Sequence, residues 1–172
     1  MLKIIAGRFK GAAIKTMSSL NYRPTKSNVR TSVFDMLSTN KYLDVLDLFS
    51  GTGILGFEAA SRGSENITFV ENDFESFNLI KENSKLFDSC TLQFHKDNVF
   101  SFLKQTTLKY DLILADPPYL IDKEDIVSLY NSCVKLLNNN GKLILEMSSK
   151  NKFNFEGKIK KYGSTSVLIY SN

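Results

Sequence analysis

The sequence of 172 residues has little of several features that mark specialised classes of protein. Its two cysteines, Cys90 and Cys133, form no C-x-x-C pair, so neither a zinc site nor a disulfide scaffold is expected. Three prolines and nine glycines are too few for a low-complexity chain. No apolar run approaches the roughly 18 residues of a membrane span, and charge interrupts the first apolar residues too early for a signal peptide. These absences predict a cytoplasmic protein that contacts no membrane and holds no metal.

The chain has enough apolar residues to build a core, because 42% of its residues are hydrophobic. An ordinary domain has roughly 150 residues, so residues 1–172 are expected to form a single domain. Within it, residues 44–172 have the pattern of an α/β sheet. Residues 1–43 do not follow that pattern and form an N-terminal extension.

The alternation of short apolar runs and amphipathic stretches from residue 44 onward predicts an α/β fold. We expect a Rossmann-like, doubly wound, mostly parallel seven-stranded sheet that ends in a C-terminal antiparallel hairpin. The expected strands are 44–49, 66–71, 91–95, 110–115, 142–147 and two more within 157–170. The expected helices are 54–62, 74–87, 99–103 and 123–138, and a turn is expected at 138–141.

The N-terminal extension is predicted to hold a small hairpin, a helix and an excess of basic charge. Residues 4–6 and 12–14 flank a glycine-bounded turn, and Ser27 to Leu37 places apolar residues on one helical face. Residues 1–34 contain seven basic side chains and no acidic one, and residues 150–172 contain five lysines and one glutamate. Such ends suit a polyanion, although they could equally serve solubility. The candidate contacts to a polyanion are Arg8, Lys10, Arg23, Lys26 and Arg30.

A glycine motif follows the first predicted strand of the sheet. Gly51, Gly53 and Gly56 form G-x-G-x-x-G between a strand and a helix, which is the context of a nucleotide-binding turn. Glycines there let the backbone turn tightly and approach a ligand closely. The motif alone does not separate NAD from S-adenosylmethionine, and a purely structural turn remains an alternative.

Polar residues also follow the next two predicted strands. Glu71 lies 18 residues beyond Gly53 and could accept hydrogen bonds from both ribose hydroxyls of an adenosine-containing cofactor. Its alternative is a solvated carboxylate at a strand end. Asp97 and Asn98 suit the adenine amino group, but Asp97 could instead cap the short helix 99–103.

The most specific motif is Asp116-Pro117-Pro118-Tyr119, directly after a buried strand. Two consecutive prolines remove two hydrogen-bond donors and stiffen the loop. A rigid loop would hold the Asp116 carboxylate and the neighbouring carbonyls in place, with Tyr119 as a stacking surface. This arrangement suits a planar ligand that carries an amino group.

These motifs resemble those of S-adenosylmethionine-dependent methyltransferases that act on the exocyclic amines of bases. The resemblance rests on V-L-D-L-F-S-G-T-G at 45–53 and D-P-P-Y at 116–119. It narrows to the RsmD-type 16S rRNA guanine 2-amino methyltransferases through segments that extend over nearly the whole chain. Ser27 and Thr31 depart from that family, which often has acidic residues at these two places. The matching segments are 4–11, Arg23-Pro-Thr25, Val29-Arg30, Phe34-x-x-Leu37, 56–63 and 162–165.

The resemblance implies S-adenosylmethionine as cofactor and 16S rRNA, or the small ribosomal subunit, as partner. We expect the protein to be a monomer. Asp116 and the Pro117 carbonyl would accept hydrogen bonds from the 2-amino group of a flipped-out guanine, on which Tyr119 would stack. With Pro118, these residues form the implied catalytic set. His95, the only histidine, is not expected to take part in catalysis. The implied cofactor-binding residues are Asp47, Phe49, Gly51, Gly53, Glu71, Asn72, Asp97, Asn98 and Asp116.

Other classes of function remain open at this point. A related methyltransferase could act on another RNA or on DNA adenine, although a DNA enzyme usually adds a target-recognition region. A dinucleotide-binding oxidoreductase would account for the glycines and Glu71, but not for the Asp-Pro-Pro-Tyr motif. A non-enzymatic RNA-binding module would leave the polar strand ends unexplained.

Overall fold

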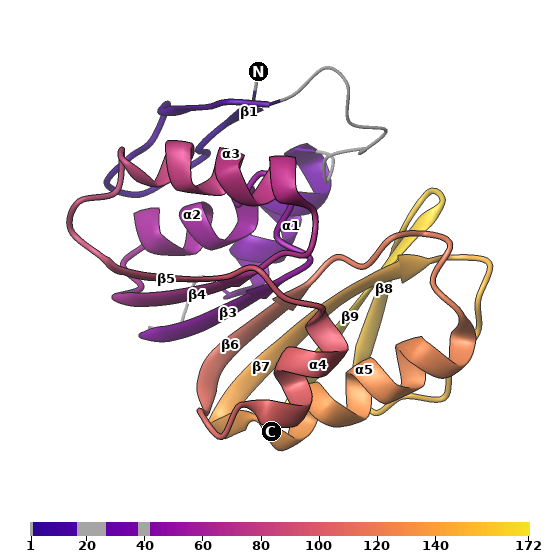
Figure 1. Ribbon diagram of the computed structural model, residues 1–172. Coiled ribbons are helices and arrows are strands. Elements are labelled where there is room, and N and C mark those ends of the chain that lie inside the picture. The colour runs from indigo at the N-terminus through magenta and orange to yellow at the C-terminus, as the bar shows by residue number, and fades with distance from the viewer. Residues whose placement is uncertain (1, 17–26, 38–41) are drawn as a thin grey trace.

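A computed structural model describes residues 2–16, 27–37 and 42–172 (Figure 1). Its main sheet has seven strands in the order β5-β4-β3-β6-β7-β9-β8. Strands β3 to β7 are parallel, and β9 pairs antiparallel with both β7 and β8. The predicted Rossmann-like fold with a C-terminal antiparallel hairpin is confirmed. The strands are Asp44–Leu48 (β3), Asn66–Val70 (β4), Thr91–His95 (β5), Tyr110–Ala115 (β6), Leu137–Ser148 (β7), Lys158–Tyr162 (β8) and Thr165–Ser171 (β9).

Helices cover both faces of this sheet, and each face has its own buried cluster (Figure 1). One cluster joins α1, α2 and α3 to the sheet, and the other joins α4 and α5 to the opposite face. In the first cluster, the ring of Phe57 packs against the rings of Phe69 and Phe87, with centroids 4.9 and 4.4 Å away. The helices are Ser27–Leu37 (α1), Ile54–Ser61 (α2), Phe74–Ser84 (α3), Val99–Gln105 (α4) and Lys123–Lys135 (α5). Within the described residues, none of the helices has the length and apolar character needed to cross a membrane.

The boundary of α5 and β7 differs from the prediction. The helix ends at Lys135, and the predicted turn at 138–141 lies inside β7. The register shifts there, because Tyr110 pairs with Leu137 whereas Leu112 pairs with Lys142. The extra residues form an irregularity with Asn140 at φ 63°, so a turn-like composition is accommodated within a strand.

The N-terminal hairpin is present, with strands Leu2–Lys3 (β1) and Ala13–Ile14 (β2), but the prediction that its first strand is 4–6 is wrong. The backbone N–H groups of Ile5 and Ala6 donate to the Glu58 carboxylate of α2, at 2.8 and 3.1 Å, and so leave the strand. Glu58 is fully buried and also accepts a hydrogen bond from Arg62 Nε. Three donors therefore compensate the burial of this carboxylate, and the two from Ile5 and Ala6 attach the extension to the sheet layer.

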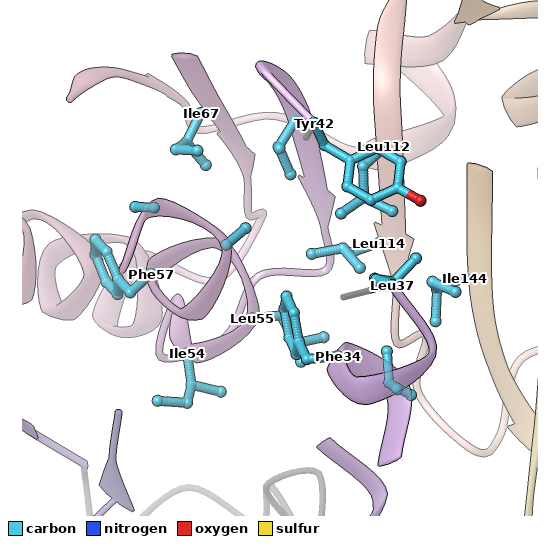
Figure 2. Close-up of a cluster of buried hydrophobic side chains, with 14 of the residues drawn as sticks. Phe34, Leu37, Tyr42, Ile54, Leu55, Phe57, Ile67, Leu112, Leu114 and Ile144 are labelled. Carbon is cyan, nitrogen blue, oxygen red and sulfur yellow. The ribbon is translucent and has the colours of Figure 1, made fainter. Parts of the chain in front are cut away.

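Apolar contacts attach α1 to the same layer. Val29, Val33, Phe34 and Leu37 are buried in the cluster of the α2 face. Figure 2 shows Phe34 and Leu37 beside side chains of α2 and β6. The side chain of Arg62, which directly follows α2, lies over the Phe34 ring at 5.0 Å from its centroid.

The hairpin lies close against α2 at Gly7. A Cβ at Gly7 would lie 1.8 Å from the Ser61 carbonyl oxygen, whereas a Cβ at Gly11 meets nothing within 4 Å. Both glycines have positive φ, at 83° and 86°. Gly11→Ala should therefore cost only the left-handed backbone penalty of about 1–2 kcal/mol. Gly7→Ala should cost at least about 1 kcal/mol more, because it also displaces the hairpin.

The free energy of unfolding in urea, measured for both variants, checks this expectation. Equal losses in the two variants would show that the contact between Gly7 and Ser61 does not hold the hairpin to α2.

Candidate active site

The register of the parallel strands brings three sequence motifs to one edge of the sheet. Leu48, the last residue of β3, pairs with Val70 of β4 and with Ala115 of β6. The next residue of each strand, Phe49, Glu71 and Asp116 respectively, is one of the predicted site residues. Figure 1 shows β4, β3 and β6 side by side in the sheet.

The glycine loop adopts a conformation that needs its glycines. Phe49, Gly51 and Gly53 all have positive φ, at 55°, 55° and 76°. A Cβ at Gly53 would lie 2.5 Å from the Phe57 ring, so glycine is required there by space as well as by conformation. Phe49 is not glycine, and its left-handed backbone is the kind of local strain that accumulates at functional sites.

Carboxylates accept hydrogen bonds from two backbone N–H groups of this loop, those of Gly51 and Gly56. Glu71 Oε2 accepts from Gly51 N at 2.7 Å, and Glu71 Oε1 accepts from Asp73 N at 2.8 Å. Asp47 Oδ2 accepts from Gly56 N at 2.9 Å. The structure thus fixes the Glu71 carboxylate at the strand end while leaving lone pairs on both oxygens for a ligand.

Asp47 is the most unusual ionisable group of the site. It is 1% exposed, and burial raises the pKa of its carboxyl well above the ordinary value of 3.8. The Gly56 N–H opposes this shift, and the nearby carboxylates of Asp116 and Glu71 add to it. Three acidic side chains therefore lie close enough to influence one another, which suits a ligand that brings positive charge.

Asp97 and Asn98, the two residues predicted to suit the adenine amino group, make different contacts after the end of β5. Asn98 is the N-cap of α4, and its Oδ1 accepts from Phe100 N and Ser101 N. The alternative that Asp97 caps this helix is therefore wrong, because the cap is one residue later. Asp97 accepts a hydrogen bond from Asn98 N, and Asn72 lies exposed after Glu71.

The Asp-Pro-Pro-Tyr loop forms a tight turn at the end of β6. Ile121 N donates to the Pro118 carbonyl at 3.0 Å, which places Tyr119 and Leu120 at the tip. Pro117 is buried, and Tyr119 keeps 49% of its surface exposed. A cavity of about 10 Å³ opens beside the loop, and Asp116 and Glu146 both line it.

Glu146 is a residue that the sequence reasoning missed. It is 6% exposed on β7, beside the Asp-Pro-Pro-Tyr loop. The signal was its acidic side chain within the apolar run of residues 143–147, which would otherwise be expected to carry only apolar side chains in a buried strand.

The predicted polyanion contacts differ in where they lie. Arg8 and Lys10 are exposed on the turn of the N-terminal hairpin. Arg30 is only 2% exposed, and its Nη2 donates to the Lys3 carbonyl at 2.7 Å. Because a buried guanidinium cannot face a macromolecule, the structure corrects the placement of Arg30 and gives it a role in holding the extension. Arg23 and Lys26 lie outside the described residues.

The described part of the chain contains no cluster of three or more His, Cys, Asp or Glu side chains that could hold a metal ion. The acidic residues of the site are instead engaged by backbone N–H groups, as at Glu71 and Asp47.

The fold and the glycine loop define a Rossmann-like α/β protein with an acidic site at the strand ends. The chain belongs to the family described as "Conserved hypothetical protein 95", whose model matches residues 2–171. Membership confirms the resemblance to RsmD-type proteins that the sequence motifs indicated.

Curated relatives include proteins named "Ribosomal RNA small subunit methyltransferase D". The relative from Buchnera aphidicola is 38% identical over 120 residues, which cover 67% of this chain and 62% of that protein. The relative from Haemophilus influenzae is 34% identical over 123 residues, which cover 69% of this chain and 64% of that protein. The matched segment thus spans less than two thirds of either relative.

The fold is shared with a solved structure over nearly the full length of both chains. A hypothetical protein of Thermus thermophilus superposes with a TM-score of 0.86, 27% identity and 98% coverage of each chain. The architecture described above, including the N-terminal hairpin, is therefore similar to an experimentally determined one.

The raised pKa of Asp47 predicts how stability depends on pH. Because the folded state holds the proton more tightly than the unfolded state, the stabilisation is complete below the ordinary pKa and is lost as pH rises through the folded value. Asp47→Asn removes the titration and keeps an acceptor for Gly56 N–H. As pH rises above the ordinary value of 3.8, the free energy of unfolding of wild type should therefore fall relative to that of the variant.

Urea unfolding at several pH values in this range measures the difference, with the exposed Asp122→Asn as a matched control. A difference between wild type and Asp47→Asn that stays constant with pH would contradict the burial effect.

Proposed function

We propose that the protein transfers a methyl group from S-adenosylmethionine to the exocyclic 2-amino group of a guanine in 16S ribosomal RNA. The observation that carries this proposal is the strand register, which sets the Asp-Pro-Pro-Tyr loop directly beside the acidic glycine loop. The names of the relatives from Buchnera aphidicola and Haemophilus influenzae support methyl transfer to the RNA of the small ribosomal subunit.

The site suits a cationic cofactor better than a pyrophosphate. A dinucleotide-binding turn offers free N–H groups to phosphate, but here Gly51 N and Gly56 N already donate to carboxylates. The carboxylates of Glu71 and Asp116 would repel a pyrophosphate and attract a sulfonium or an ammonium group. These contacts favour S-adenosylmethionine over NAD and argue against an oxidoreductase.

The residues fit this cofactor, and Glu71 has the clearest part. Its carboxylate is fixed by two backbone N–H groups and would accept hydrogen bonds from the ribose hydroxyls. S-adenosylmethionine supplies, when bound, an electrophilic methyl group on a positively charged sulfur. The residues proposed to hold it are Asp47, Phe49, Gly51, Gly53, Glu71, Asn72, Asp97, Asn98 and Asp116.

The loop after β6 would hold the base that is methylated. The lone pair of a guanine 2-amino group is delocalised into the ring, so the nitrogen is a poor nucleophile. Asp116 and the Pro117 carbonyl would accept hydrogen bonds from its N–H groups and favour the pyramidal nitrogen that attack requires. After the methyl group leaves the sulfur and bonds to the nitrogen, the nitrogen would lose one proton to water or to Asp116. Pro117 and Pro118 keep these acceptors in place, and Tyr119 offers its ring for stacking.

The substrate is proposed to be 16S rRNA or the small ribosomal subunit. Arg8 and Lys10 are exposed and could neutralise backbone phosphates, with Arg23, Lys26 and the C-terminal lysines as further candidates. The hairpin turn lies at the far end of α2 from the glycine loop, about 12 Å away for a helix of eight residues. RNA that reaches both places would have to extend across this face. We expect a monomer that acts in the cytoplasm.

The proposal is tested with purified protein, labelled S-adenosylmethionine and small subunits from a strain that lacks this activity. Nucleoside mass spectrometry of the product should show N2-methylguanosine. Label found as N6-methyladenosine in DNA, or in an RNA other than 16S rRNA, would show methyl transfer to a different substrate. Failure to bind S-adenosylmethionine, with binding of NAD, would support the oxidoreductase instead.

Glu71→Ala should weaken the binding of S-adenosylmethionine by about 1.5–3 kcal/mol, or roughly 10- to 100-fold, because a charge-assisted acceptor is lost. Isothermal titration measures the affinity. Glu124→Ala, at the exposed start of α5, is the control and should bind like wild type. Unchanged affinity in Glu71→Ala would make Glu71 a structural partner of the glycine loop only.

Asp116→Ala should lower the rate of methyl transfer by about 10²–10³, with the fold intact and most cofactor affinity retained. The Asp116 acceptor gains strength as positive charge develops on the nitrogen, so its loss affects turnover more than binding. Single-turnover kinetics at saturating cofactor measure the effect. Asp122→Ala, in the same segment and without a side-chain capping bond, is the control. Near-normal turnover in a folded Asp116→Ala would exclude this loop as the catalytic one.

A further inference from the structure

Tyr119 is held at its hydroxyl by a residue far away in the sequence. Its hydroxyl lies 2.6 Å from Thr165 Oγ1, across a separation of 46 residues. Thr165 is 7% exposed at the start of β9, whereas Tyr119 is 49% exposed. The neighbouring Leu120 occupies the same turn and is 96% exposed. One side chain at the tip of the turn is therefore anchored to a buried partner.

The segment that carries Thr165 is itself firmly placed. Ser149 N donates to the Ser164 carbonyl at 2.9 Å, and Ser149 Oγ donates to the Gly163 carbonyl at 3.1 Å. Thr165 pairs with Ser148 of β7 on one side and with Tyr162 of β8 on the other. The antiparallel insertion of β9 between β7 and β8 thus delivers a fixed hydroxyl to the Asp-Pro-Pro-Tyr loop.

The same hairpin tip also contacts the N-terminal extension. The Tyr162 hydroxyl lies 2.5 Å from Ser32 Oγ of α1. Residues 162–165, which we name the hairpin tip, therefore join α1 on one side and Tyr119 on the other. Through Thr165, the hairpin tip is in direct contact with the Asp-Pro-Pro-Tyr loop.

We propose that Thr165 is a positioning residue that fixes the ring plane of Tyr119 for stacking on the target base. The inference rests on the proposed function and names a residue outside the catalytic and cofactor-binding sets. An exposed tyrosine is otherwise free to change rotamer, and stacking requires one orientation of its ring. The hydrogen bond restricts that freedom before the base arrives, so less ordering is needed on binding.

Four proteins test the proposal: wild type, Thr165→Val, Tyr119→Phe and the double variant. Thr165→Val keeps the shape and removes the hydroxyl, and Tyr119→Phe keeps the ring and removes the other partner. Thr165→Val should raise KM for RNA about 2- to 12-fold, the worth of one net hydrogen bond, while kcat and the affinity for S-adenosylmethionine stay within about twofold. Tyr119→Phe should have a similar effect, and the double variant should be no worse than either single one.

Two controls separate positioning from general structure. Thr165→Ser restores the hydroxyl and should restore the KM of wild type. Thr91→Val makes the same chemical change at an exposed residue of edge strand β5 and should change nothing. The free energy of unfolding of Thr165→Val should stay near that of wild type, because the freed Tyr119 hydroxyl can turn to water.

The outcomes distinguish this inference from the function on which it rests. A wild type that binds S-adenosylmethionine but methylates no RNA contradicts the proposed function and this inference with it. An active wild type contradicts the positioning role alone in two cases. In the first, Thr165→Val leaves KM unchanged. In the second, its effect is the same in the Tyr119→Phe background as in wild type.

Discussion

The site depends on two carboxylates that accept the backbone N–H groups of the glycine loop. Glu71 binds Gly51 N from the neighbouring strand, and Asp47 binds Gly56 N from beneath the first turn of α2. The second contact needs glycine, because a Cβ at Gly56 would lie 3.0 Å from Asp47 Oδ2 and 2.4 Å from the Phe69 ring. The same two contacts that shape the loop occupy two N–H groups that a phosphate could otherwise bind, and they place carboxyl groups beside the loop. Loop conformation and cofactor chemistry therefore have one physical origin.

The N-terminal extension is connected to this loop by hydrogen bonds as well as by apolar packing. Asn83 of α3 is 2% exposed, and its side chain donates to the carbonyls of Lys15 and Thr52 and accepts from Lys15 N. The extension thus contacts the glycine loop through one amide group and contacts α2 through Glu58. The hairpin tip in turn links α1 to Tyr119. A segment suited to RNA and the loops suited to cofactor and base are parts of one network of contacts.

Much of the fold followed from the periodicity of the sequence, because buried parallel strands form continuous apolar runs that alternate with helices. The strand ends 49–53, 71 and 116–119 could be placed for the same reason. Tertiary contacts decided what periodicity could not. The asparagines before Gly141 are typical of a turn but lie in an irregular strand. Arg30 is of a residue type typical of the surface, but its side chain is buried and donates to the Lys3 carbonyl. Thr165 and Glu146 reach the site only through the strand order, with β9 between β7 and β8, which local sequence patterns do not specify.

A crystal structure of the protein with S-adenosylhomocysteine would test the central claim most directly. The account predicts that the ribose hydroxyls lie within hydrogen-bond distance of the Glu71 carboxylate, with no anion on the N–H groups of Gly51 and Gly56. It also predicts that the sulfur faces Asp116 and the ring of Tyr119. A ribose bound away from Glu71, or a sulfur that faces away from the Asp-Pro-Pro-Tyr loop, would contradict it.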